Sequence, residues 1–376
     1  NEKGNPMKPH LSRRYFLLGS ASLLAQAALW KPTFGQSAKL STVPIVDSLT
    51  VKVLIDSSYD TPRVGTSKWL KVKRTSPYTP AGNVRRVLHN QWGLSLALQS
   101  RIGRDTRDLM LDYGYTPEAL LNNMELIGVD GGKTQAMILS HGHFDHFGGM
   151  LGYVQKYRDK LPADLTLYVG GEDNFCIRKA PSGAPGNYAD YGVLDRKELD
   201  ALKVKIVYCE EPTVIMGHAF TTGAIARRTF EKVLPNTIVE YGKTNGLGCE
   251  IPAASAKAAG KAVPDEHLHE HGTCFNVKDR GLVVMSSCGH SGVLNTVLQA
   301  REVSGINKVH AVLGGFHLFP APDDYLRRTV AELKALDPDV VIPFHCSGPG
   351  FINAMREMLG DRLFVSTTGT EFTFGA

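Results

Sequence analysis

The sequence lacks several features that define whole classes of protein. It has no Cys-x-x-Cys pair, which argues against a zinc knuckle, and six cysteines are too few for a disulfide-built scaffold in 376 residues. No apolar run reaches the about 20 residues that a membrane-spanning helix needs. Repeats and low-complexity tracts are also missing. The composition, 43% hydrophobic and 21% charged, is typical of a folded globular protein.

The charge of the chain is too small to indicate a nucleic-acid-binding protein. The formal net charge is +5 at pH 7. Residues 1–38 hold five basic side chains and one acidic side chain, so the remaining chain carries only +1. Binding to a phosphate backbone needs several clustered cations. We therefore expect no nucleic-acid partner and a small-molecule substrate.

The basic residues near the start of the chain have a different explanation. Arg13 and Arg14 directly precede a mildly apolar stretch that extends to Trp30 and is interrupted by Ser, Gly and Gln. The pattern resembles a twin-arginine export signal that begins at Met7, with a basic surface helix as the alternative. It predicts a periplasmic protein carried by the twin-arginine export machinery. We expect residues 1–38 to form this signal and an N-terminal extension.

Metal-binding side chains are concentrated in one short segment. Three histidines and one aspartate fall within six consecutive positions: His141, His143, Asp145 and His146. Neutral imidazoles bind zinc and other borderline first-row cations, and a carboxylate adds an oxygen ligand. The apolar run 135–139 before them predicts a buried strand, and a predicted helix follows from residue 149. The segment therefore predicts a metal site, dinuclear by its ligand count, in a strand-to-helix turn.

This segment and three later ones resemble the signature of the metallo-β-lactamase superfamily. The later segments are Ser-Cys-Gly-His-Ser-Gly at 287–292, Gly-Gly-Phe-His-Leu at 314–318 and His-Cys-Ser-Gly at 345–348. In this order they are similar to the branch that contains dihydropterin-linked aminobenzene ribofuranosyl phosphate synthases and many metal-dependent hydrolases. The resemblance covers about residues 48–376. It implies an α/β fold, the αββα sandwich, with two mixed sheets face to face, helices outside and ligands at one edge.

Strands and helices alternate twice along the body of the chain, which suits the same architecture. We expect strands at 49–55, 93–102, 108–112, 135–139, 165–169, 204–208, 213–216, 274–277, 282–286, 309–313 and 340–343. Expected helices begin at 116–118, with Thr as cap and Pro in the first turn, and span 149–160, 293–302, 323–336 and 351–359. We treat residues 39–376 as one domain.

Two segments are expected insertions near the site. Segment 180–192 is an expected loop, and 230–263 is an expected long irregular insertion. Either is a lid over the substrate or a surface insertion without a role.

We assign three protein ligands to each of two divalent ions. The assigned sets are His141, His143 and His290 for the first ion, and Asp145, His146 and His345 for the second. Three ligands leave coordination positions open, as in catalytic rather than structural zinc sites. Zinc is the preferred metal, with manganese or iron as alternatives. The pair would activate a shared water as hydroxide and polarise the substrate oxygen.

Other polar residues are candidates for catalysis and substrate binding. The superfamily often places a bridging carboxylate where this chain has the segment that ends in His317, so His317 is either a further ligand or the acid that protonates the leaving group. Asp145 is the second catalytic candidate. Arg227 and Arg228 are expected to bind an anionic group by forked hydrogen bonds, or else form a solvated pair.

Two further groups of residues allow more than one interpretation. In the run 266–271, alternation would place three histidines on one face of an extended segment, and we assign His267 to the substrate wall in preference to a third metal site. Cys288 and Cys346 each lie beside a candidate ligand histidine. We interpret them as small buried residues in tight turns, with metal ligation as the alternative. One disulfide after export remains open.

The sequence thus predicts a periplasmic metal-dependent hydrolase of an ester, lactone, amide or phosphoester. A pterin-linked synthase or transferase is the first alternative, against which export argues. A di-iron redox protein would be favoured by Glu at the second motif position, where this chain has His143. A binding protein without turnover is the last alternative, and the intact set of six candidate ligands argues against it.

Overall fold

The computed structural model describes residues 38–60, 65–75, 86–251, 256 and 258–375. By its internal contacts the chain divides after Gly35, and all described residues belong to the second part. The expected export signal, with Arg13 and Arg14, lies outside the described residues. Within the described ranges, no helix has the length and apolar character that crossing a membrane requires.

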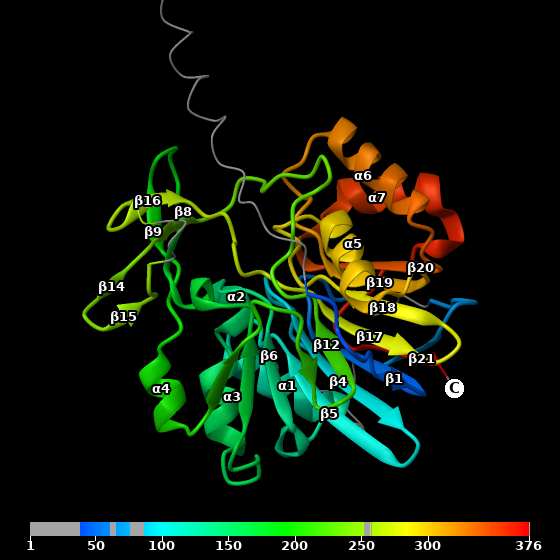
Figure 1. Ribbon diagram of the computed structural model, residues 1–376, viewed down its shortest axis with the longest axis horizontal. Coiled ribbons are helices and arrows are strands. Elements are labelled where there is room, and N and C mark those ends of the chain that lie inside the picture. Colours follow the sequence, from blue (N-terminus) through cyan, green and yellow to red (C-terminus); the bar gives the residue numbers. More distant parts are fainter. Residues whose placement is uncertain (1–37, 61–64, 76–85, 252–255, 257, 376) are drawn as a thin grey trace, which may run out of the picture. The chain divides into compact units, whose positions relative to one another are not determined.

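Two mixed β-sheets form the centre of the described chain (Figure 1). The strands of the eight-stranded sheet, in spatial order, are β10 (Lys205–Tyr208), β7 (Thr166–Val169), β6 (Ala136–Leu139), β5 (Asp105–Leu111), β4 (Ser95–Ile102), β2 (Ser48–Ile55), β21 (Thr370–Gly375) and β3 (Lys71–Arg74). Those of the seven-stranded sheet are β11 (Val214–Ile215), β12 (Ala219–Thr221), β17 (Thr273–Val277), β18 (Gly281–Met285), β19 (Val309–Gly315) and β20 (Val340–Phe344), with β1 (Ile45–Val46) beside β17.

The two sheets pack face to face around a shared hydrophobic core. Val51 and Leu96 of the first sheet and Phe275 and Leu313 of the second belong to one buried cluster and are 0% exposed. Strand β2 alternates between buried and half-buried positions, as expected for a strand with one face on a core. Burial of such apolar side chains contributes about 1.5–3 kcal/mol each.

Helices cover the outer face of each sheet (Figure 1). Helices α1 (Pro117–Ile127) and α3 (Met150–Tyr157) share a second buried cluster with β6 and β7, while α5 (Val293–Ser304), α6 (Asp323–Ala335) and α7 (Pro349–Leu359) share a third with β18, β19 and β20. Helix α1 begins as predicted, with Thr116 Oγ1 accepting from the Ala119 amide and Pro117 in the first turn. The predicted αββα fold class is confirmed.

The structure corrects the expectation for segments 180–192 and 230–263. Segment 180–192 is not a plain loop, because β8 (Ile177–Pro181) and β9 (Tyr188–Asp190) pair antiparallel. Strands β13 (Ile238–Glu240) and β16 (Ala262–Pro264), from the longer segment, complete a small sheet in the order β16-β13-β8-β9. A further hairpin joins β14 (Lys243–Thr244) to β15 (Leu247–Gly248). Strands of two to five residues are too short for a periodic signal.

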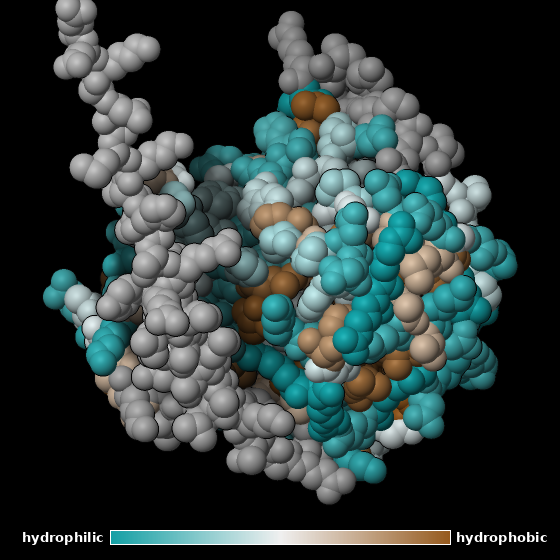
Figure 2. Space-filling view, turned by 90° about the horizontal axis from the view of Figure 1, so that it is seen from above, coloured by the Kyte–Doolittle hydropathy of each residue, from teal (hydrophilic) through white to brown (hydrophobic). Residues whose placement is uncertain are grey.

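Several short elements were also missed in the two main layers. The helix expected at 149–160 ends at Tyr157, and a separate short helix, α2 (Phe144–Phe147), lies inside the metal-binding segment. Strands β3, β12 and β21 and helix α4 (Arg196–Ala201) were not predicted. On the face seen in Figure 2, hydrophilic residues surround smaller groups of hydrophobic ones.

One disulfide, Cys176–Cys249, ties the small sheet to the rest of the chain, while Cys209, Cys274, Cys288 and Cys346 are free and buried. The bond closes a loop that spans 73 residues, so it strongly restricts the unfolded chain.

We predict that the double variant Cys176→Ser/Cys249→Ser loses about 2–5 kcal/mol of unfolding free energy, because the loop constraint is gone. Urea denaturation followed by circular dichroism measures this loss. The variant Cys209→Ser, which changes a free buried cysteine, controls for the removal of sulfur. An unchanged urea midpoint in the double variant would contradict the prediction.

Candidate metal centre

The metal-binding segment follows the end of β6, in the middle of the eight-stranded sheet. All four residues of β6 are buried between β5 and β7, as predicted for this apolar run. At the end of the strand, the amide and hydroxyl of Ser140 donate to the two carboxylate oxygens of Asp112, at 2.9 and 2.8 Å. These bonds hold the chain as it turns toward α2 and fix the backbone position of His141.

Three histidines of the first predicted set lie together. The ring centroids are 4.7 Å apart for His141 and His143, 5.0 Å for His141 and His290, and 4.8 Å for His143 and His290. His290 comes from the loop after β18 in the other sheet. Its backbone amide donates to Glu270 Oε1 at 3.0 Å, which fixes this loop.

The second predicted set lies beside the first. Asp145 Oδ2 is 3.2 Å from His345 Nε2 and 3.8 Å from His146 Nε2. His345 follows β20, so this set also joins the two sheets. The rings of His141 and His146 are 4.3 Å apart, which makes the two sets one continuous cluster. The structure therefore brings together all six residues that the sequence proposed as ligands.

Each histidine of the metal-binding segment has one ring nitrogen held by the protein. His141 Nδ1 lies 3.0 Å from Ser140 Oγ, and His146 Nδ1 lies 2.7 Å from Asp112 Oδ2. His143 is held on the opposite nitrogen, since its Nε2 is 2.9 Å from Thr237 Oγ1. Such contacts behind a metal-binding histidine orient the ring and fix its tautomer.

Five of the six candidate ligands also have buried atoms without hydrogen-bond partners. These atoms are His141 Nε2, His146 Nε2, His345 Nε2, Asp145 Oδ1 and both ring nitrogens of His290. A buried polar atom without a partner costs about 1–3 kcal/mol. Six such atoms in one cluster therefore fit divalent cations, which accept the lone pairs that no donor satisfies.

Burial also sets the protonation of the cluster. It lowers the pKa of His141, His143 and His290 well below the usual histidine value. The imidazoles are therefore neutral at pH 7, the form that binds metal ions. Burial raises the pKa of Asp145, but the neighbouring His146 and His345 outweigh it, so the net pKa lies below its usual range and the carboxylate is ionised.

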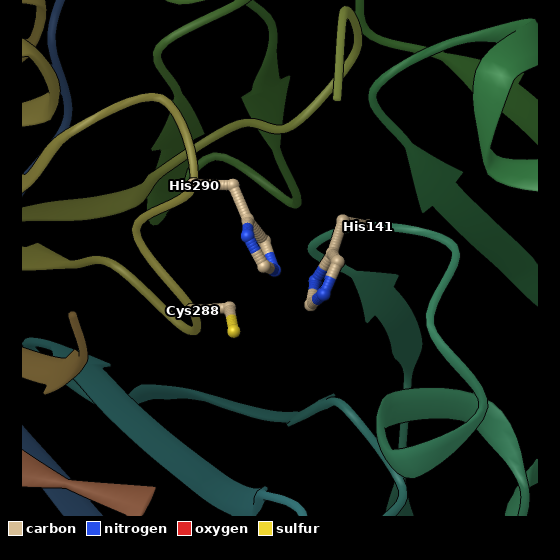
Figure 3. Close-up of side chains that lie close together, drawn as sticks. All are labelled: His141, Cys288 and His290. Atoms are coloured by element: carbon tan, nitrogen blue, oxygen red, sulfur yellow. The ribbon is translucent and has the colours of Figure 1, made fainter. Parts of the chain in front are cut away.

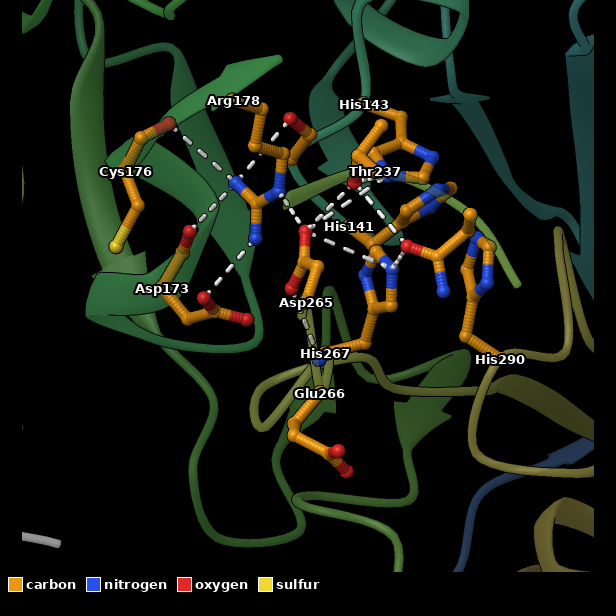
Figure 4. A network of polar contacts seen from close by, with 12 residues as sticks. His141, His143, Asp173, Cys176, Arg178, Thr237, Asp265, Glu266, His267 and His290 are labelled. Carbon is orange, nitrogen blue, oxygen red and sulfur yellow. Dashed lines mark hydrogen bonds and ion pairs between the residues drawn. The ribbon is translucent and has the colours of Figure 1, made fainter. Parts of the chain in front are cut away.

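A buried arginine connects the small sheet to the metal-binding segment (Figure 4). Arg178 of β8 donates from Nε to Asp265 Oδ2 at 2.5 Å and from Nη2 to Asp173 Oδ1 at 2.9 Å. Its Nη1 donates to the Gly142 carbonyl at 3.3 Å. A Cβ at Gly142 would lie 2.5 Å from this nitrogen, so glycine is what allows the approach. Asp265 Oδ2 in turn accepts from Thr237, which holds His143.

Backbone strain is concentrated at the same place. Asp112, His267, His317 and His345 have φ of 57°, 46°, 45° and 46°, a left-handed conformation that non-glycine residues seldom adopt. Each such residue costs about 1–3 kcal/mol and persists only where its surroundings fix it.

The histidine-rich run 266–271 does not form the expected extended face. A turn at residues 268–269 separates the three imidazoles. His267 stacks on His290 with centroids 3.8 Å apart and joins the metal cluster rather than a separate substrate wall. His271 donates to the Leu139 carbonyl, and His269 Nδ1 accepts from the Asp173 amide. The alternation argument failed because the positive φ of His267 reverses the chain direction.

The polar atoms of the remaining predicted site residues already pair with other protein atoms. His317 Nε2 donates to the Pro235 carbonyl at 3.2 Å, and its Nδ1 lies 3.8 Å from Cys288 Sγ. Both ring nitrogens thus face protein atoms. Arg227 pairs with Glu266 and Arg228 with Glu302, so both guanidiniums are already matched with carboxylates.

Aromatic side chains border the cluster, and no sequence motif predicted their position there. The ring of Trp92 is 4.7 Å from that of His345 and 5.7 Å from that of Phe319. Trp92 and Phe319 are 47% and 52% exposed. On the other side, Tyr191 lies 5.5 Å from His143, and burial and the nearby Asp145 raise the pKa of its phenol.

Comparison with known proteins agrees with this geometry. Residues 99–226 match the model of the metallo-β-lactamase superfamily. A solved metal-dependent hydrolase of the β-lactamase superfamily superposes with a TM-score of 0.61 at 19% identity, covering 86% of this chain and 98% of that one. This chain has the metallo-β-lactamase fold.

Two curated relatives, both from Methanocaldococcus jannaschii, extend the similarity. One is named 7,8-dihydropterin-6-methyl-4-(beta-D-ribofuranosyl)-aminobenzene-5'-phosphate synthase and is 29% identical over 69% of this chain and 82% of its own length. The other is an uncharacterized protein, 26% identical over 65% of this chain and 80% of its own. One of these relatives is thus named as a synthase, whereas the superposed structure is described as a hydrolase.

We predict that Asp112→Asn weakens metal binding about 10- to 100-fold, because an amide cannot accept from both Ser140 and His146 as the carboxylate does. Competition with a chromophoric chelator measures the affinity. Asp108→Asn, on strand β5 just before Asp112, is the control, since Asp108 accepts an exposed hydrogen bond from Gln99. Equal affinities of the two variants would show that Asp112 does not orient His146.

Proposed function

We propose that this protein is a metal-dependent hydrolase with a dinuclear centre, zinc by preference, that cleaves an ester, lactone, amide or phosphoester of a small molecule. The observation that carries the proposal is the convergence of six buried candidate ligands, five of which have atoms without a hydrogen-bond partner. Three protein ligands for each ion leave coordination positions for water and substrate. No nucleophilic side chain is needed.

The chemistry divides between the ions and the chain. Two divalent ions in such a site lower the pKa of water and polarise a carbonyl or phosphoryl oxygen. Asp145 stays ionised because His146 and His345 lie beside it, so it can ligate and also accept a hydrogen bond from the reacting water. The raised pKa of Tyr191 keeps its phenol protonated, so the phenol can donate a hydrogen bond to Asp145. The buried surroundings limit competition from bulk water.

A pterin-linked synthase is the second candidate, because the similarity to the synthase extends over 69% of this chain. In that case the same ligands would promote group transfer rather than hydrolysis. Assays for release of product from the corresponding synthase substrates separate the two candidates.

The aromatic border favours a substrate with a flat apolar group. Trp92 and Phe319 meet edge to face beside His345 and stay half exposed, where a ligand ring can pack on them.

We predict that Trp92→Ala raises the KM for aryl esters about threefold to tenfold, because one aromatic contact to the substrate is lost. The KM for alkyl esters of the same carboxylic acid should stay unchanged. An equal rise for both would show that Trp92 acts on the fold and not on the substrate ring.

We also propose that the protein works in the periplasm after twin-arginine export. Arg13 and Arg14 before the apolar stretch support this, and so does the Cys176–Cys249 disulfide, because such bonds persist in oxidising compartments. Replacing both arginines by lysine and fractionating the cells tests the proposal. An unchanged distribution between fractions would exclude this export route.

The hydrolase proposal is tested with a panel of phosphodiesters, lactones, aryl esters and β-lactams, in metal-loaded and chelated enzyme. We predict that His143→Ala lowers bound metal and turnover together, turnover by about 100-fold or more, because the first ion loses one of three ligands. His218→Gln is the control, since His218 is buried near Ser100 and Asp105, away from the cluster.

Metal content is measured by elemental analysis and turnover by product release. If His143→Ala hydrolyses an identified substrate at the wild-type rate, the proposed centre is wrong. If metal-loaded protein forms the synthase product and hydrolyses nothing in the panel, the second candidate replaces the first.

A further inference from the structure

A buried cysteine lies at the junction of the two predicted ligand sets. Figure 3 shows the imidazoles of His141 and His290 approaching each other, with the sulfur of Cys288 beside their ends. The Sγ atom and one nitrogen of each ring lie within 4.8 Å of one another. Cys288 comes from the loop after β18, two residues before His290, and is 2% exposed.

The same sulfur also belongs to the second ligand set. Cys288 Sγ and ligand nitrogens of His146 and His345 lie within 4.8 Å of one another. No other cysteine, aspartate or glutamate takes part in both of these groups among the residues described. Among the metal-binding groups of the described residues, Cys288 is thus shared by one group with histidines of the first set and one with histidines of the second.

This position has a chemical use, because the segment 314–317 contains no carboxylate to link the ions. A thiolate binds zinc at about 2.3 Å and has lone pairs for two ions. Two ions about 3.5–4 Å apart would subtend roughly 100–120° at such a sulfur, an angle that sulfur accommodates.

The surroundings of Cys288 suit a sulfur that is fixed in place. Cys346 Sγ lies 3.2 Å away and accepts from the backbone amide of His317, also at 3.2 Å. The two sulfur atoms are therefore in contact, and the His317 amide holds the Cys346 sulfur in place. His317 Nδ1, at 3.8 Å from Cys288 Sγ, closes the third side.

We propose that Cys288 is the thiolate ligand that bridges the two ions, in place of a carboxylate. When the sulfur–metal bonds form, the thiol proton passes to solvent, and no oxidant or reductant takes part. Cys346 and His317 position this sulfur and do not ligate. The inference rests on the proposed dinuclear centre and adds a seventh ligand to it.

Cobalt(II) substitution tests the inference, because thiolate ligation to cobalt gives a charge-transfer absorption in the near ultraviolet. The variants are Cys288→Ser and Cys288→Asp, with Cys346→Ser and Cys274→Ser as controls for the neighbouring thiol and for a buried cysteine on β17. We expect the absorption in the wild type and both controls and not in the Cys288 variants. Metal affinity should fall about 10- to 100-fold in Cys288→Ser and recover in Cys288→Asp, where a carboxylate replaces the bridge.

The outcomes separate this inference from the proposed function. If Cys288→Ser keeps both ions and the absorption while the wild type is a hydrolase, only the inference fails. If the absorption disappears in Cys346→Ser but not in Cys288→Ser, or a third ion depends on Cys346 and His317, the bridge is wrong. If the wild type shows the absorption with two ions but hydrolyses nothing, the bridge stands and the proposed function fails. Cys288→Asp, read together with circular dichroism, distinguishes ligand loss from misfolding.

Discussion

The main constraint on the structure is a cluster of buried ligand atoms without hydrogen-bond partners in the protein. Five imidazole nitrogens and a carboxylate oxygen without hydrogen-bond partners would destabilise any ordinary core. Left-handed backbone at His267, His317 and His345 adds further cost. The core, the small sheet and the buried Arg178 pairs hold the cluster together against these costs. In the proposed function, divalent cations bound at the cluster would satisfy these atoms and so stabilise the arrangement.

The division of the ligands between the two sheets follows from the same constraint. His141, His143, Asp145 and His146 come from the edge of the first sheet, and His290 and His345 come from loops of the second. Because neighbouring parallel strands end at the same edge, short loops suffice to bring them together. The small sheet then adds Arg178 and Tyr191 from the side. Catalytic side chains are thus placed by strand ends, and their fine orientation depends on Asp112, Thr237 and Asp265.

The sequence predicted the layers and the convergence of the six ligands, because long apolar strands and a dense histidine motif are strong local signals. It could not predict the contacts that orient the ligands, because these come from single polar residues far away in the chain. Ser57 Oγ lies 2.9 Å from His345 Nδ1, and Thr237, which is held by Asp265, contacts His143. The alternation argument for residues 266–271 failed at a positive φ, which only the surrounding contacts impose. Short strands such as β8 and β13 have no periodic pattern of their own and form by pairing with each other, so the sequence did not predict them.

The position of β21 has a consequence for how the chain reaches this state. Residues 370–375 pair with β2 on one side and with β3 on the other, so the first sheet has a gap until the final strand arrives. Strand β3 comes early in the chain but pairs only with β21 among the described strands. The sheet that carries the metal-binding segment can therefore be completed only after residues 370–375 have been synthesised.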